Sequence, residues 1–152
     1  MQQKPKVTLR QFDTYIAMIE NSVGSFMFKN LYLNVDETKK DATEDGRLSC
    51  AFYVSAILYM TKYIKDMHAT VASTIKDLKE SGWEAVTEPV PGSVIVWKVG
   101  PQDTNGHPHI GFYMGDNHAI SNDSLKKHPT KHDWKYDGKR EVEMILWNPK
   151  IN

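Results

Sequence analysis

Residues 49–65 constrain the fold more than any other part of the chain, because their apolar side chains leave almost no polar face. Their spacing predicts a helix, and a helix that is apolar on nearly every side must be buried. The apolar run is interrupted at Tyr53 and Ser55 and is too short to cross a bilayer. We therefore expect a central helix that the other elements of the fold cover.

Two further helices are predicted from apolar residues at helical spacing. One covers residues 8–21, with Thr8 as its N-cap, and the other covers residues 69–82, with Gly82 as its stop signal. Residues 35–46 are polar and charged, and they predict an exposed loop.

Beyond residue 83 the hydrophobic period changes to that of strands. Short apolar runs separated by Gly, Pro and Asn turns predict strands at residues 93–97, 109–114, 118–122 and 141–147. Since the helices come first and the strands follow, the predicted class is α+β, with N-terminal helices packed on a small antiparallel β-sheet.

Length and charge exclude several classes of protein. A chain of 152 residues suits a single domain over residues 1–152. Lys plus Arg and Asp plus Glu both total 19, so we expect neither nucleic acid nor a membrane surface as a partner. No signal peptide or transmembrane segment is visible, so we expect synthesis in the cytoplasm and any export by a route without a signal peptide. The oligomeric state stays open.

Cys50 is the single cysteine, which excludes an internal disulfide framework and a Cys-rich zinc site. It lies at the start of the predicted central helix. Backbone N–H groups and the positive end of a helix dipole lower a thiol pKa, and the same groups can hold an oxyanion. The alternative is an inert core thiol beside Ala51 and Phe52.

His109 begins the predicted strand 109–114, and an imidazole is the usual base for a cysteine nucleophile. Gly111, on the same strand face, is expected to leave space for the helix to approach. The alternative is a solvated or merely packed His109. His107 and His109 without patterned carboxylates are a weak metal signal, so no metal or cofactor is expected.

Three ordered blocks carry a family resemblance. Residues 49–54 read Ser-Cys-Ala-Phe-Tyr-Val, residues 91–97 read Pro-Gly-Ser-Val-Ile-Val-Trp, and residues 109–115 read His-Ile-Gly-Phe-Tyr-Met-Gly. Together they resemble the NlpC-type papain-like cysteine peptidases, with the CHAP amidases as near relatives. In that family a Cys opens a helix, and a His begins a strand of the His-Val-Gly-Ile-Tyr kind. The resemblance implies a papain-like fold with Cys50 as nucleophile and His109 as general base.

The chain departs from the family pattern around both residues. Ala51-Phe52 stands where the family usually has Ser-Gly, and the slot of the third polar residue, which orients the His, falls on Ser121. We choose Asn122 as the third catalytic residue, because its amide offers an acceptor and a bulge in the preceding turn could bring it onto the His109 face. Alternatives are Ser121, Asp123 and His132, the last in a segment that could wall the cleft. The resemblance also suggests an upstream oxyanion donor, Tyr32.

The function that the resemblance implies is that of a cysteine peptidase or amidase. It would cleave amide bonds in bacterial cell-wall peptidoglycan through a thioester acyl-enzyme, without a cofactor, so that the expected partner is peptidoglycan or a peptide substrate. One alternative is an acyltransferase or thioesterase of the same fold. The other is a non-catalytic binding module in which Cys50 is part of the core.

Overall fold

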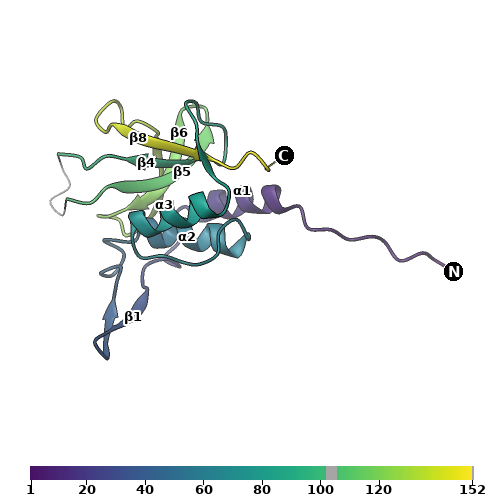
Figure 1. Cartoon of the computed structure of the whole chain (residues 1–152), viewed down its shortest axis with the longest axis horizontal. Coiled ribbons are helices and arrows are strands. Elements are labelled where there is room, and N and C mark those ends of the chain that lie inside the picture. The colour runs from purple at the N-terminus through teal and green to yellow at the C-terminus, as the bar shows by residue number, and fades with distance from the viewer. Residues whose placement is uncertain (102–105, 152) are drawn as a thin grey trace.

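The computed structural model describes residues 1–101 and 106–151, and it packs helices against an antiparallel sheet (Figure 1). The helices are α1 (Gln11–Asn21), α2 (Cys50–Met60) and α3 (Val71–Glu80). The strands are β1 (Tyr32–Val35), β2 (Thr38–Asp41), β3 (Glu84–Ala85), β4 (Val94–Trp97), β5 (His109–Gly115), β6 (His118–Asp123), β7 (His128–Asp133) and β8 (Val142–Trp147). The predicted α+β class is confirmed.

The described strands form two sheets. β1 and β2 make a separate hairpin, and the main sheet has the order β3-β8-β4-β5-β6-β7, with every pairing antiparallel. The loop at residues 100–108, expected between β4 and β5, lies partly outside the described residues. None of the helices in the described part of the chain has the length and apolar character needed to cross a membrane.

Helix α2 is buried on every side, as the sequence predicts. All residues from Ala51 to Leu58 are buried, against α1, α3 and the sheet. The helix ends at Met60, before the expected end at residue 65, and Lys62 has a positive φ of 65° that no α-helix can continue. This burial fixes the position of Cys50, the first residue of the helix.

The main sheet is covered on both faces. Val96, Ile110 and Ile120 are in the core cluster that includes α2. Because side chains alternate along a strand, the neighbouring residues Trp97 and Ala119 face the other way, and there they pack with Trp134 and Tyr136. The loop between β7 and β8 therefore closes the second face, the one that also carries His109.

The predicted N-cap Thr8 is wrong, since Arg10 has that position before α1. Two strand regions also differ from the prediction. The expected exposed loop at residues 35–46 contains strand β2 of a hairpin, which projects from the body (Figure 1). Its base is held by the Asp41 carboxylate, which accepts hydrogen bonds from the main-chain N–H groups of Leu31 and Asp45. Strand β7 was not predicted, because it is polar and forms by pairing along the edge of β6.

Candidate active site

Cys50 lies half-buried at the N-terminus of α2. Burial raises the pKa of its thiol above the ordinary value. The main-chain N–H groups of Ile110, Ala51 and Cys50 itself donate toward the sulfur and oppose that shift, but burial prevails. The lowered thiol pKa expected from the helix start is therefore not found, because a desolvated site penalises the thiolate more than the helix terminus favours it.

His109 occupies the first position of β5, where its ring stacks on Trp97 with 5.3 Å between ring centroids. Its Nε2 lies 2.9 Å from Ser121 Oγ. Burial lowers the pKa of His109 to about 3, and the positive charges of Arg140 and His132 add to the shift. The imidazole is therefore neutral at neutral pH.

The N–H group of Ile110 links these two residues in space. It contacts the Cys50 sulfur, and Ile110 directly follows His109 in β5. The N-terminus of α2 and the beginning of β5 are thus adjacent. Burial disfavours the charged form of both the thiol and the imidazole, so each group is neutral at neutral pH.

Ser121 is the centre of a polar cluster on the face of the sheet that carries His109. Its Oγ lies 2.9 Å from His109 Nε2, 2.7 Å from His132 Nε2 and 3.0 Å from the Tyr136 hydroxyl. A serine hydroxyl has one proton to donate and two lone pairs to accept with. The three contacts therefore use its full hydrogen-bonding capacity.

The chemistry of the partners assigns the direction of each bond. His132 Nδ1 lies 2.7 Å from the Asp133 carbonyl oxygen, which can only accept, so Nδ1 carries the proton. Burial lowers the pKa of His132, so its ring is neutral and its Nε2 accepts from Ser121. Burial raises the pKa of Tyr136 to about 12, which leaves its hydroxyl as a donor.

The tautomer of His109 follows from this assignment. Ser121 donates to His132, so it accepts from the Tyr136 hydroxyl and from the Nε2–H of His109. A neutral imidazole has one proton, and here it is on Nε2. His109 Nδ1 is therefore the nitrogen with the free lone pair, which is what a general base requires.

Asn122 does not share the face of His109. Its Nδ2 donates to the Gly46 carbonyl at 2.9 Å, so it fixes the turn that leads into Cys50. A register shift does occur between Tyr113 and Gly115, as a bulge near the turn would produce, but it leaves Ser121 on the His109 face. The predicted contact between Asn122 and His109 is wrong, because alternation along β6 points the two neighbours to opposite faces.

Gly111 is required for a reason other than the one expected. A Cβ at this position would lie 2.7 Å from Ser121 Cβ and 3.0 Å from Trp97. The absent side chain thus makes room for the serine and the indole that hold His109, and the expectation that it makes room for the helix is wrong.

The other candidates lie elsewhere. The Asp123 carboxylate accepts from the main-chain N–H groups of Leu125 and Lys126 in the turn before β7. Tyr32, expected as an oxyanion donor, is exposed on the hairpin under Lys39. Within the described residues, no group of three or more His, Cys, Asp or Glu side chains is placed to hold a metal ion.

Sequence reasoning missed Tyr136 and Arg140. Both come from the loop before β8, and no spacing relative to Cys50 or His109 predicts their position. The only signal was the sequence His-Asp-Trp-Lys-Tyr at residues 132–136, which the structure places against Ser121 and Trp97.

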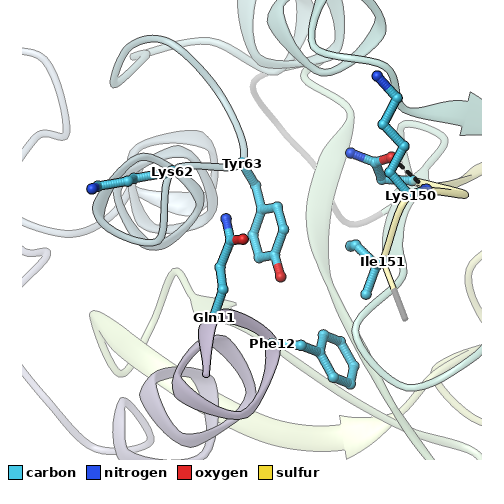
Figure 2. Close-up of a pocket in the computed structure, with 7 residues that line it drawn as sticks. Gln11, Phe12, Lys62, Tyr63, Lys150 and Ile151 are labelled. Atoms are coloured by element: carbon cyan, nitrogen blue, oxygen red, sulfur yellow. Dashed lines mark hydrogen bonds between the residues drawn. The ribbon is translucent and has the colours of Figure 1, made fainter. Parts of the chain in front are cut away.

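Two cavities in the described part of the chain are relevant to the site. One, of about 340 Å³, is lined by Gln11, Phe12 and Lys62 together with C-terminal residues (Figure 2). It lies past the end of the 11-residue helix, which puts it about 15 Å or more from Cys50. The other, of about 630 Å³, lies between the residues after β4 and the loop before β8, and its lining includes Arg140, whose guanidinium carbon is 5.8 Å from the centre of the Tyr136 ring.

Comparison with known proteins supports the fold. No protein-family model and no curated protein matches the sequence. Among solved structures, NlpC2 from Trichomonas vaginalis is similar, with 15% identity, a TM-score of 0.55 and coverage of 92% of this chain. The chain spans about half (48%) of the length of that protein. The chain thus has an α+β fold of the NlpC-like, papain-like kind.

Proposed function

We propose that the chain is a cysteine peptidase or amidase, with Cys50 as nucleophile and His109 as general base. The observation that carries the proposal is the meeting of Cys50 with the beginning of β5, where the Ile110 N–H contacts the sulfur and Ser121 holds the neighbouring imidazole. An inert core thiol needs neither an oriented imidazole nor a cluster of main-chain donors.

The reaction starts from the neutral pair. His109 Nδ1 takes the thiol proton while the sulfur of Cys50 attacks the amide carbonyl carbon. The amine leaves with that proton, and a thioester stays on Cys50. Water then adds to the thioester with His109 again as base, which releases the acid and restores the thiol. No cofactor is needed for any of these steps.

The electrostatics of the site suit proton transfer coupled to attack. A thiolate is disfavoured in the resting site because burial raises the Cys50 pKa. In the tetrahedral intermediate the negative charge is on the carbonyl oxygen, and the main-chain N–H groups around the sulfur would be its donors. Charge therefore develops only when a substrate carbonyl is in place.

The substrate class that we propose is an amide bond in a peptide, with bacterial cell-wall peptidoglycan as the first candidate. The family resemblance of the three sequence blocks supports peptidoglycan, and the papain-like fold is consistent with it. The chain would then act on stem-peptide or sugar–peptide amides.

Digestion of purified peptidoglycan, with mass spectrometry of the fragments, tests the proposal. Wild type is expected to release peptide or amide-cleaved fragments, and Cys50→Ala to release none. Acyl esters serve as a second substrate set, since turnover of esters alone would indicate a thioesterase. Failure of the folded wild-type protein on both substrate sets would indicate a binding module and refute the hydrolase.

A further inference from the structure

His132 is connected to the proposed base through a single hydroxyl group. Its Nε2 lies 2.7 Å from Ser121 Oγ, and the same oxygen lies 2.9 Å from His109 Nε2. The three residues come from β7, β6 and β5, which are neighbours in the main sheet. A change in the hydrogen bonding of His132 can therefore reach His109 through the direction of the Ser121 hydroxyl.

The His132 ring is held as an acceptor toward Ser121. Its Nδ1 donates to the Asp133 carbonyl oxygen at 2.7 Å, so in the neutral ring Nε2 has no proton. Burial lowers the pKa of His132, although the hydrogen bond to Asp133 opposes the shift, so the ring is neutral at neutral pH. The ring also stacks on Tyr136, with 4.1 Å between the ring centroids and 19° between the planes, which fixes its orientation.

The single proton of the Ser121 hydroxyl has two nitrogen acceptors within reach, His132 Nε2 and His109 Nε2. Because His132 Nε2 can only accept, the proton goes there, and His109 Nε2 must donate to the serine oxygen. Without an acceptor at position 132, the hydroxyl would instead donate to His109. The one proton of the neutral His109 ring would then be on Nδ1, where the lone pair of the proposed general base is needed.

We propose that His132 is a positioning residue that, through Ser121, keeps the proton of His109 on Nε2. The consequence for catalysis rests on the proposed function, whereas the direction of the hydrogen bonds does not depend on it. Tyr136 differs from His132 in this respect, because it donates to Ser121. Loss of the Tyr136 donor leaves the serine proton on its acceptor, and loss of the His132 acceptor releases that proton toward the base.

Two variants of His132 and a control in the same strand separate this role from packing. His132→Phe removes both ring nitrogens and keeps an aromatic ring against Tyr136, while His132→Gln keeps an acceptor in its amide oxygen. The control is His128→Phe in β7. The Nδ1 of His128 also bonds the carbonyl oxygen of the next residue, Pro129, at 2.9 Å, but its ring packs against Phe26.

Imidazole ¹⁵N chemical shifts of the full chain at neutral pH locate the His109 proton. We expect it on Nε2 in wild type, His132→Gln and His128→Phe, and on Nδ1 in His132→Phe. On an amide substrate, His132→Phe should lower kcat by roughly 10- to 1000-fold with little change in KM, because the base then has the wrong tautomer. His132→Gln should recover most of that loss, and His128→Phe should keep the wild-type kcat.

The position of the proton decides the proposal. A proton that stays on His109 Nε2 in His132→Phe would overturn it even if kcat falls, since the loss would then be structural. Equal losses of kcat in His132→Phe and His132→Gln, or in His132→Phe and His128→Phe, would overturn it as well.

Failure of the proposed function gives a different result. If the wild type hydrolyses no amide substrate, the hydrolase is refuted, and the proton shift in His132→Phe still tests the role of His132. If His132→Phe lacks the dispersed NMR spectrum of a folded protein, His132→Leu carries the same predictions, because leucine also offers no acceptor to Ser121.

Discussion

The two faces of strand β6 hold neighbouring residues with different tasks. Ser121 faces the His109 side, where its hydroxyl contacts two imidazoles and a phenol. Asn122 faces the α2 side, where it ties the Gly46 carbonyl to the sheet and so positions the turn before Cys50. Under the proposed function, one face orients the proposed base and the other positions the turn before the proposed nucleophile. A shift of one residue in strand register would therefore exchange these two tasks.

The largest loss of activity is expected when Cys50, the proposed nucleophile, is replaced. Cys50→Ala should lower turnover by roughly 10⁴-fold or more, because no other side chain at this position supplies the nucleophile. Urea unfolding should show a change in stability of no more than about 2 kcal/mol, because the volume removed is small. Hydrolysis at the wild-type rate by this variant, assayed on the same substrate, would rule out Cys50 as the nucleophile.

The comparison of the two faces predicts opposite results for the neighbours in β6. Ser121→Ala should lower kcat by roughly 10- to 1000-fold with little change in KM, since His109 loses the acceptor that orients it. Asn122→Ala should instead lower stability by about 1–3 kcal/mol, because the buried Gly46 carbonyl loses its donor. Steady-state kinetics and urea unfolding of both variants measure the difference.

The reverse pattern would transfer the orienting role to Asn122, as the sequence alone suggested. In that case kcat would fall with Asn122→Ala and would be retained by Ser121→Ala.

The face with His109 also predicts how stability depends on pH. The pKa of His109 is lowered in the fold from its ordinary value of 6.5 to about 3, so between these values the unfolded chain binds more protons. The contribution of the neutral imidazole is thus complete above pH 6.5 and is lost as pH falls toward 3. Between pH 6.5 and pH 5, the free energy of unfolding of the wild type should fall by about 1.5 kcal/mol more than that of His109→Gln.

Urea unfolding at these two pH values measures that difference. His118→Gln is the matched control, since it removes the same side chain from an exposed position at the start of β6. Identical pH dependence in wild type and His109→Gln would mean that the imidazole titrates normally in the folded protein.

The smallest effect is expected at the periphery of the cluster. Tyr136→Phe removes one of two donors to Ser121 and leaves the bond from His109 intact, so kcat should fall by only about 2- to 10-fold. Steady-state kinetics of Tyr136→Phe and Ser121→Ala, measured on the same substrate, compare the two losses in kcat. A loss larger than that of Ser121→Ala would give Tyr136 a direct part in the reaction.

Physical reasons explain which parts of the fold the sequence could predict. Helix α2 was predictable because its residues are apolar all round, and the β5–β6 hairpin because Asp116 and Asn117 suit the positive φ angles that its tight turn requires. Strand β7 and the β1–β2 hairpin are polar or exposed, so no periodic burial marks them. Their formation depends on pairing, which a pattern along the chain does not contain.

The residues of the candidate site also differ in how far the sequence could predict them. Cys50 and His109 could be named as candidates because each begins an element within a recognisable sequence block. The choice of Asn122 over Ser121 depended on strand register, which the turn residues alone did not fix. Tyr136 reaches the cluster from a loop, so its position depends on the tertiary fold.

The most direct test of the account is the protonation state of His109, read from imidazole ¹⁵N chemical shifts as a function of pH. We predict a neutral ring above about pH 4, with the proton on Nε2 and a bare Nδ1, since the pKa of His109 is about 3 and Ser121 accepts from Nε2. The signals are assigned by their loss in His109→Gln. An imidazolium at neutral pH, or a proton on Nδ1, would contradict the neutral pair and the general-base role derived from it.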